Sequence, residues 1–374
     1  MIYFYKTEKT LSTPNALAVG RHSLLVARRA VASAGLFELR ATSDEPRRDY
    51  NEQMRYRTFG RTGWNVSEVG YGMWGMGGWT GSDDQESLAS LDRAIGLGCT
   101  FFDTAWIYGQ GHSEQLLGET LRRHHGSRLY VATKIPPMNM KWPAKPVYAL
   151  EDVYPADHIR EYTERSLQNL GTSTIDLQQF HVWSDEWAGD ERWQRAVSAL
   201  KEEGLVRAIG ISINRWQPEN AVRAIQTGLI DAVQVVYNVF DQNPEDTLFP
   251  ACQSANVAVI ARVPFDEGSL TGKLTAQSRW PDGDFRNIYF SPENLAATLP
   301  RVDRLRSVVP AGMSMPELAL RHILQHPAVS TVIPGMRKLA HVEQNLAVSD
   351  GRALPDDLMA ELGLHRWERR VDIE

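Results

Sequence analysis

Four residues with acid–base or hydrogen-bonding side chains follow three consecutive apolar segments of the chain. Asp103 ends the first segment and Tyr108 follows it, Lys134 ends the next, and His181 ends the third. Taken singly, each has an ordinary explanation, as a helix cap, a packing aromatic, a solvated lysine or a structural histidine. Residues at the carboxyl ends of parallel barrel strands meet over one face. If the segments are such strands, the four side chains lie together and share one chemistry.

A tyrosine beside a lysine is suited to donating a proton near neutral pH. The free phenol has a pKa of about 10, and a neighbouring ammonium such as that of Lys134 favours the phenolate and lowers this pKa. A carboxylate such as Asp103 holds the ammonium in place, and His181 can hydrogen-bond an oxygen that gains negative charge. Reduction of a carbonyl by a nicotinamide needs such a set, because the alkoxide formed must be protonated. We predict that Tyr108 is the acid.

The elements that must position these residues are short apolar segments alternating with helical patterns from residue 66 onward. The predicted strands are 66–71, 100–104, 129–133, 175–181, 208–212, 232–237, 258–263 and 330–333. Apolar strands alternating with helices predict an α/β fold with a parallel sheet. Eight such units favour a closed (β/α)8 TIM barrel over an open sheet. Segments 56–59 and 64–66 flank an Arg-Thr-Gly turn and predict an N-terminal β-hairpin, and we expect a helix at the C-terminus.

Two loops of the predicted barrel are long, and the first 53 residues differ from the rest. Loops 136–154 and 266–291 are expected to be functional lids. Residues 1–53 show no sustained strand or helix period, and their many acidic residues do not fit a transit peptide. We expect 1–53 to be a disordered extension or to precede the true start at Met54, and 54–374 to form a single barrel domain.

The amino-acid composition restricts the kinds of partner that this protein is expected to bind. The formal net charge of −6 supplies no basic field for nucleic acid or anionic lipid. The two cysteines, Cys99 and Cys252, imply no disulfide framework and suit a reducing cytoplasm. No apolar segment reaches the roughly 20 residues of a membrane span. We therefore expect a cytoplasmic protein that acts on a small molecule and binds neither nucleic acid nor membrane.

A Gly-x-Gly-x-x-Gly pattern at Gly70, Gly72 and Gly75 imitates a Rossmann dinucleotide fingerprint. That fingerprint must run directly into a helix whose N-terminus meets the pyrophosphate. Here the turn-rich segment 75–81 follows, and the next helical pattern begins only near Asp84. The pattern is therefore interpreted as a loop at the barrel mouth.

One segment resembles the signature of the aldo-keto reductase family. It reads Asp103-Thr-Ala-x-x-Tyr108-Gly-x-Gly-x-Ser113-Glu-x-x-Leu-Gly118, and the segments Ala-Thr-Lys134 and Phe-His181 match the rest of the family's catalytic tetrad. The resemblance extends from about residue 54 to 350 and is strongest to the bacterial branch of general-stress and inositol-linked reductases. It implies a barrel enzyme that binds NADP(H) across the barrel mouth without a Rossmann fold.

The resemblance also implies cofactor contacts. Ser212, Gln234 and Asn214 match the positions that hold the nicotinamide carboxamide, although many members have Ser and Asn adjacent. Arg262 stands where many relatives have a stacking aromatic, and a planar guanidinium can stack as well. The full set expected to bind NADP(H) is Gly72, Met73, Trp74, Ser212, Asn214, Gln234, Arg262, Pro264, Gly268, Lys273, Gly335, Arg337, His341, Gln344 and Asn345.

Among these, Arg337 is expected to bind the 2′-phosphate of NADP(H), because its fork of donors lies near a helix start. Gln344 and Asn345 would contact the adenine and Lys273 a phosphate. The alternative for Arg337, Lys338 and Lys273 is that they are solvated surface cations.

The substrate pocket is expected to be aromatic. Trp74, Trp106 and Trp183 lie beside the catalytic positions and would bind an apolar aldehyde, ketone or quinone-like compound, although rim packing explains them equally well. Two other functions use the same residues: an NADP-binding redox sensor similar to potassium-channel β-subunits, and a sugar or polyol dehydrogenase with Tyr108 as base. No metal is predicted, because the histidines lack partner ligands at metal spacing.

Overall fold

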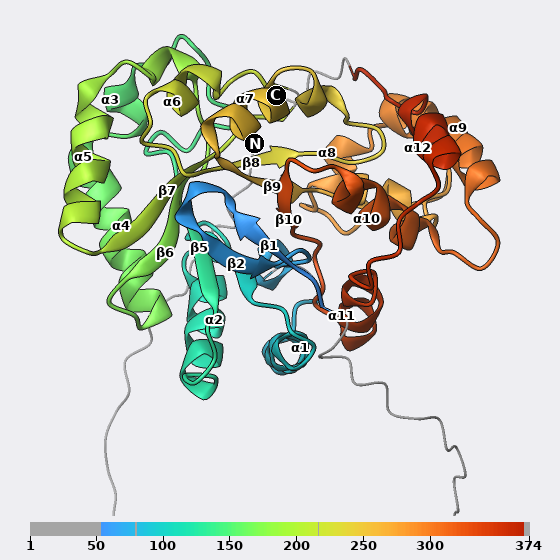
Figure 1. Ribbon diagram of the computed structural model, residues 1–374, viewed down its shortest axis with the longest axis horizontal. Helices are drawn as coiled ribbons and strands as arrows, with labels where there is room; N and C mark the ends of the chain where they lie inside the picture. Colours follow the sequence, from blue (N-terminus) through green and yellow to red (C-terminus); the bar gives the residue numbers. More distant parts are fainter. Residues whose placement is uncertain (1–53, 79–80, 216, 370–374) are drawn as a thin grey trace, which may run out of the picture. The chain divides into compact units, whose positions relative to one another are not determined.

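The computed structural model of the protein describes residues 54–78, 81–215 and 217–369 (Figure 1). Our expectation for residues 1–53, and with it the hypothesis of a start at Met54, lies outside the described residues. In the described part of the chain, no helix is long and apolar enough to cross a membrane.

Eight parallel strands form the barrel in sequence order. Each pairs with the next along the chain, and their bounds are β3 (Tyr71–Gly72), β4 (Phe101–Asp103), β5 (Tyr130–Ile135), β6 (Ile175–Phe180), β7 (Val206–Ser212), β8 (Ala232–Val236), β9 (Ala258–Arg262) and β10 (Val329–Val332). Parallel bridges Val69–Val332 and Gly72–Gly335 join the first strand to the last. The predicted (β/α)8 barrel is confirmed.

The seam between β3 and β10 explains one of the glycines. The Gly72 amide donates to Pro334 O at 3.0 Å, and a Cβ on Gly72 would lie 2.6 Å from Ile333 O. A side chain there would therefore push the two strands apart. The sequence pattern placed this glycine in a cofactor loop, but its contacts show that it closes the barrel.

The predicted first strand was too long. Residues up to Ser67 belong to the hairpin of β1 (Tyr56–Phe59) and β2 (Trp64–Ser67), which pair antiparallel as expected. Phe59 and Val66 of this hairpin are fully buried against residues near the starts of the barrel strands, including Phe101 and Ala258. The hairpin thus closes the amino-terminal end of the barrel and leaves the carboxyl end for a site.

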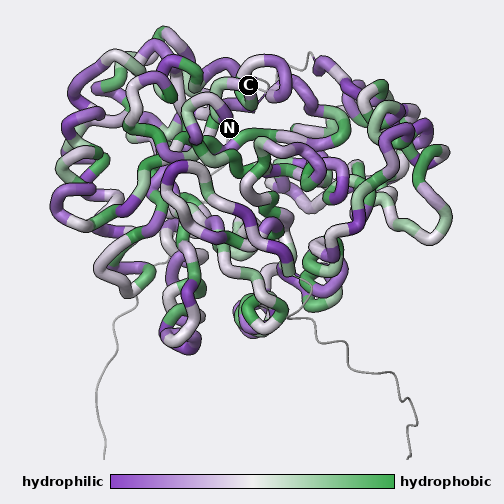
Figure 2. Tube along the Cα trace, in the orientation of Figure 1, coloured by the Kyte–Doolittle hydropathy of each residue, from purple (hydrophilic) through white to green (hydrophobic). Residues whose placement is uncertain are grey.

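Helices cover the outside of the strands (Figure 1). The longer ones are α1 (Asp84–Gly96), α2 (His112–Arg123), α4 (Ala156–Leu170), α5 (Glu191–Glu202), α7 (Leu248–Ala255), α9 (Pro292–Val308), α10 (Met315–Gln325), α11 (Leu339–Leu346) and α12 (Asp356–Gly363). Shorter helices are α3 (Leu150–Val153), α6 (Val222–Gln226) and α8 (Arg286–Tyr289). Hydrophobic and hydrophilic residues alternate along the outer helices (Figure 2), as expected when one face packs on the sheet. The expected C-terminal helix is α12.

Two helix starts test the local sequence signals. α1 begins at Asp84, as predicted, with Asp83 accepting from the Glu86 amide at its cap. α2 begins after Gly111, which is its N-cap in the left-handed region (φ 97°). In its first turn, the hydroxyl of Ser113 accepts from Thr104 Oγ1 at 2.8 Å, which fastens α2 to the end of β4.

Candidate active site

Three of the four predicted catalytic residues meet at the carboxyl end of the barrel around one ammonium. Lys134 Nζ donates to Asp103 Oδ1 at 2.5 Å and to the Thr104 carbonyl at 2.7 Å, and lies 3.4 Å from Tyr108 OH. Asp103 is the last residue of β4 and Lys134 lies near the end of β5, and the two strands are neighbours. The pairing of these two strands therefore brings Asp103 and Lys134 together.

The fourth residue, His181, lies at the edge of Tyr108. Their ring centroids are 5.8 Å apart at an interplanar angle of 79°, and Trp142 packs on the other side of His181 at 5.9 Å. His181 Nδ1 is buried and has no partner among the described residues. An unpaired ring nitrogen next to the phenol is available to a ligand that binds there.

Asp103 is held by two glutamines as well as by Lys134. Its Oδ2 accepts from Gln179 Nε2 at 3.1 Å and from Gln234 Nε2 at 2.7 Å. Gln179 lies on β6 and Gln234 on β8, and both are buried. Sequence reasoning missed Gln179 and assigned Gln234 only to the nicotinamide, whereas here its amide orients the carboxylate.

Burial and charge act in opposite directions on the pKa values of this cluster. Burial raises the pKa of Tyr108, and the Lys134 ammonium offsets this only in part, so the lowering predicted from sequence is outweighed. Burial alone would lower the pKa of Lys134, but the Asp103 carboxylate reverses this and the pKa is raised. Tyr108 is therefore a neutral donor and Lys134 a cation.

The same environment keeps His181 neutral. Burial, then the positive charges of Lys134 and Arg262, hold the pKa of His181 well below its ordinary value. A neutral imidazole can donate one hydrogen bond to a carbonyl oxygen without competing for the proton of Tyr108.

The loop 136–154 covers this cluster and is fastened to the barrel. Asn214 exchanges two hydrogen bonds with the Ala144 backbone, at 3.2 and 2.9 Å, and Trp187 donates to the Tyr148 carbonyl at 2.9 Å. Trp142 of this loop packs on His181, and Trp106 clusters with it beside Tyr108. Asn214, expected at the nicotinamide, therefore positions the loop instead.

Two of the expected site residues have no exposed surface. Trp183 is fully buried among Phe180, Trp187 and Trp193, and Met73 is fully buried in the core. Neither can line an open pocket, so these two expectations are corrected. Trp74 is exposed and Trp106 half-buried, which leaves them as aromatic groups at the mouth.

A group of cations from the segments that follow β9 and β10 lies where the phosphate contacts were expected. Lys273, Lys338 and Arg337 each lower the pKa of His341, after burial as the largest cause, so the four side chains are close together. No ion pair joins the three cations to any residue that the structure describes. Lys338 is also the N-cap residue of α11, but no side chain accepts a hydrogen bond from the first turn of that helix. These cations thus surround a helix start that attracts anions.

The other residues expected to bind the cofactor lie at the same end of the barrel, but they differ in their exposure to solvent. Gly268 (φ 111°) and Gly335 would meet nothing within 4 Å of an added Cβ, so both stand beside open space. Gln344 is exposed on α11, whereas Asn345, Ser212 and Pro264 are buried.

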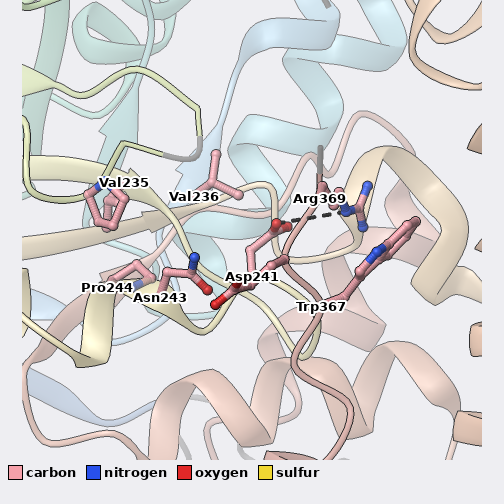
Figure 3. Close-up of a pocket in the computed structure, with 9 residues that line it drawn as sticks. Val235, Val236, Asp241, Asn243, Pro244, Trp367 and Arg369 are labelled. Atoms are coloured by element: carbon pink, nitrogen blue, oxygen red, sulfur yellow. Dashed lines mark ion pairs between the residues drawn. The ribbon is translucent and has the colours of Figure 1, made fainter. Parts of the chain in front are cut away.

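A cavity of about 180 Å³ lies between β8, the segments that follow β7 and β8, and the end of the described chain (Figure 3). Arg369 is buried there beside Asp241, with Nε–Oδ1 3.8 Å, and pairs with Asp266 at 2.7 Å. It also donates to Tyr289 OH. Sequence reasoning missed this cluster, which ties the C-terminal segment to the η6 turn (Asp266–Thr271) that carries Gly268.

A closed parallel barrel with a Tyr–Lys–Asp cluster at its carboxyl end is the architecture of a barrel oxidoreductase. The sequence profile of the aldo/keto reductase family matches residues 68–365, which is most of the chain. The chain belongs to the aldo/keto reductase family.

Individual relatives support this membership. The chain is 30% identical over 314 residues to the uncharacterized oxidoreductase YqkF of Bacillus subtilis, covering 83% of this chain and 96% of the relative. Among solved structures, the aldo-keto reductase AKR11C1 of Bacillus halodurans has a TM-score of 0.68 at 25% identity, covering 85% of this chain and 98% of the other. The glycerol dehydrogenase AKR11B4 of Gluconobacter oxydans has a TM-score of 0.67 at 27% identity, covering 83% and 94%.

Proposed function

We propose that this protein is an NADPH-dependent reductase of aldehydes or ketones, with Tyr108 as the proton donor. The observation that carries the proposal is the position of Lys134 Nζ, 2.5 Å from Asp103 Oδ1 and 3.4 Å from Tyr108 OH, at the mouth of an aldo/keto reductase barrel. The cluster can deliver a proton, and it needs a hydride source beside it.

NADP(H) fits the residues that surround the cluster. His181, whose Nδ1 is unpaired among the described residues, packs on Tyr108, and the cations Lys273, Arg337 and Lys338 gather near His341. We assign the phosphate-bearing half of the cofactor to these cations, Gly268, Gly335 and Gln344, and the nicotinamide end to Ser212, Gln234 and Trp74. A solved relative from Klebsiella pneumoniae, 25% identical with a TM-score of 0.61, is described as a complex with NADPH. When bound, NADPH supplies the hydride and its electron pair to the carbonyl carbon and becomes NADP⁺.

The chain's own residues handle the oxygen. His181 donates a hydrogen bond to the carbonyl oxygen and orients it toward Tyr108. The phenol then gives its proton to that oxygen, and the Lys134 ammonium stabilises the phenolate that remains. Asp103 and its two glutamines keep the ammonium in place. Trp142 and Trp106 cover the cluster, and the exclusion of water strengthens each of these interactions.

The same residues serve the reverse reaction, in which the phenolate takes the proton of an alcohol. The similarity to a protein described as a glycerol dehydrogenase makes alcohol oxidation the second candidate. A relative 27% identical is described as an NADH-specific methylglyoxal reductase of Escherichia coli, so both coenzymes belong in the assay.

The test is consumption of NADPH and NADH by the purified protein with simple aromatic and aliphatic aldehydes, alongside Tyr108→Phe. We expect turnover with NADPH that is lost in the variant. Tight NADPH binding without turnover of any aldehyde or alcohol would favour a redox-sensing module instead. Failure to bind either coenzyme would contradict the site assignment itself.

A further inference from the structure

Residues 263–268 lead from β9 into the η6 turn in a strained backbone conformation. Val263, Asp266 and Glu267 have φ angles of 55°, 47° and 52°, in the left-handed region that residues other than glycine, and β-branched valine above all, rarely adopt. Residues in this region cost free energy and persist only where the surrounding structure holds them. The same segment ends at Gly268, which we assign to the phosphate-bearing half of the cofactor. Its shape therefore depends on contacts from other parts of the chain.

One side chain from the C-terminal segment is connected to two of the strained residues. Arg369 Nη2 lies 2.7 Å from Asp266 Oδ1, and neither side chain has exposed surface. Arg369 Nε lies 3.8 Å from Asp241 Oδ1, and Asp241 Oδ2 accepts from Asn238 Nδ2 at 2.8 Å. The same Asn238 amide donates to the Val263 carbonyl at 3.1 Å. Arg369 thus holds Asp266 directly, and it holds Val263 through two residues of the loop after β8.

Tyr289, the last residue of α8, and Arg215, from the loop after β7, add to these contacts. Arg369 donates to the Tyr289 hydroxyl, which in turn donates to Asp266. The guanidinium also lies 5.4 Å from the centre of the Tyr289 ring. Glu267, next to Asp266, is paired with Arg215. Two cations from distant parts of the chain therefore hold adjacent residues of the turn.

The segment that carries Arg369 follows α12 and rests on the loop after β8. The Trp367 amide donates to the Phe240 carbonyl at 2.8 Å, and Arg301 of α9 lies 4.0 Å from the centre of the Trp367 ring. The cavity of about 180 Å³ borders this segment and is lined by Trp367, Arg369 and Asp241 (Figure 3). Atoms that face a void lose packing contacts on that side, so this segment can open locally while the barrel stays folded.

We propose that Arg369 is a positioning residue for the cofactor. Residues 364–369, the C-terminal clasp, keep the segment 263–268 in the shape that receives the cofactor phosphates, and opening of the clasp lets the cofactor leave. The inference rests on the proposed NADPH-dependent function and concerns its binding and release steps. Because the clasp acts on the pyrophosphate that NADPH and NADH share, it affects both coenzymes alike, whereas Arg337 is assigned to the 2′-phosphate of NADPH alone.

The first test measures the rate constant of NADPH release, koff, by mixing the NADPH-loaded protein with excess NADP⁺ in a stopped-flow fluorimeter. We expect koff to rise by at least about 10-fold in Arg369→Gln, the lower end of what a charge-assisted hydrogen bond contributes. Arg369→Lys should show a smaller rise, because an ammonium keeps the charge beside Asp266 but lacks the fork. Arg366→Ala, which removes an exposed pair with Asp246 from the same clasp, is the matched control and should keep the wild-type koff.

The second test uses Tyr289→Phe, which removes only the hydroxyl between Arg369 and Asp266 and keeps the ring, so that the measurement stands even if Arg369→Gln does not fold. We expect koff for NADPH to rise by about threefold or more, as for the loss of a neutral hydrogen bond. Fluorescence titration of each variant should show that the Kd values of NADPH and NADH rise by the same factor. Urea unfolding of the same variants measures their stability separately.

Two outcomes would overturn the inference. One is a lower urea midpoint in Arg369→Gln and Tyr289→Phe with wild-type koff and Kd, which is the pattern of a purely structural ion pair. The other is weaker binding of NADPH alone, which would mean that Arg369 acts at the 2′-phosphate. All these measurements are made without a carbonyl substrate. A protein that binds NADPH but reduces no aldehyde therefore contradicts the proposed function and leaves this test intact, whereas a wild type that binds neither coenzyme contradicts both.

Discussion

At the scale of single residues, burial and charge together determine what each catalytic group can do. Burial keeps the phenol of Tyr108 protonated, because it raises the pKa more than the Lys134 ammonium lowers it. The Asp103 carboxylate holds Lys134 charged despite its burial. The cluster is therefore a neutral acid beside a permanent cation, which suits protonation of an alkoxide more than proton abstraction at neutral pH.

Replacing Lys134 by Met should test the function of this cation. The phenolate left after proton transfer would lose its neighbouring charge, and the pKa of Tyr108 would rise further. We expect kcat for aldehyde reduction to fall by about 10²- to 10⁴-fold, the range of general acid catalysis. Because a buried Asp103 would lose its partner, the double variant Asp103→Asn, Lys134→Met serves as a folding control. A fall of less than about threefold would contradict the assigned role.

Replacing Arg337 by Ala should separate the two coenzymes. If Arg337 binds the 2′-phosphate, the variant loses a charge-assisted contact that NADH never makes. Its Kd for NADPH should rise by about 10- to 100-fold, while the Kd for NADH changes little. Fluorescence titration measures both values, and equal losses for the two coenzymes would refute the assignment. Arg337 also donates to the Gly75 carbonyl at 3.3 Å, so circular dichroism should accompany the titration.

At the scale of elements, the barrel could be predicted because each strand is an apolar, β-branched segment between helical patterns. The predicted start of the first strand was wrong, because Val66 and Ser67 belong to the same apolar segment of the sequence but pair in the hairpin. The roles predicted for Met73, Trp183 and Asn214 were wrong for another reason. Burial of an aromatic and the partner of an amide depend on segments far away, as with Asn214 and Ala144, which are 70 residues apart.

The C-terminal segment is an element whose function could not be predicted from the sequence. Arg369 is buried between Asp266 and Asp241 and holds the η6 turn, which we assign to the cofactor. Replacement by Met would remove the cation that pairs with the buried carboxylate of Asp266. We expect a loss of about 3–5 kcal/mol in the free energy of unfolding, together with a higher Kd for NADPH.

The matched control for Arg369→Met is Arg366→Ala. Arg366 pairs with Asp246 on the surface, where side chains are 32% and 53% exposed, so its removal should cost less than about 1 kcal/mol. Urea unfolding measures both variants. Similar losses in the two would mean that the buried pair contributes no more than the exposed one.

At the scale of the whole molecule, one buried histidine couples the free energy of unfolding to pH. His322 of α10 is buried against Tyr237, and both ring nitrogens lack partners in the described part of the chain. Burial, then the charge of His326, lowers the pKa of His322 to about 4.

This pKa predicts acid destabilisation with a defined pH window. The unfolded chain binds the His322 proton near pH 6.5, whereas the folded protein binds it only near pH 4. Stability from this group is therefore complete above pH 6.5 and falls as the pH drops toward 4. Relative to pH 7.5, His322→Phe should lose about 2–3 kcal/mol less than the wild type by pH 4.5, as measured by urea unfolding. The exposed His125→Gln should behave like the wild type, and parallel curves for all three proteins would contradict the prediction.

The most direct measurement is the oxidation of bound NADPH by an aldehyde in a single turnover, followed by stopped-flow fluorescence in the wild type and in Tyr108→Phe. We predict that both bind NADPH with the same Kd and that the variant oxidises it at least about 100-fold more slowly, because only the proton donor is lost. Equal single-turnover rates in the two proteins would show that Tyr108 is not the acid and would contradict the proposed mechanism.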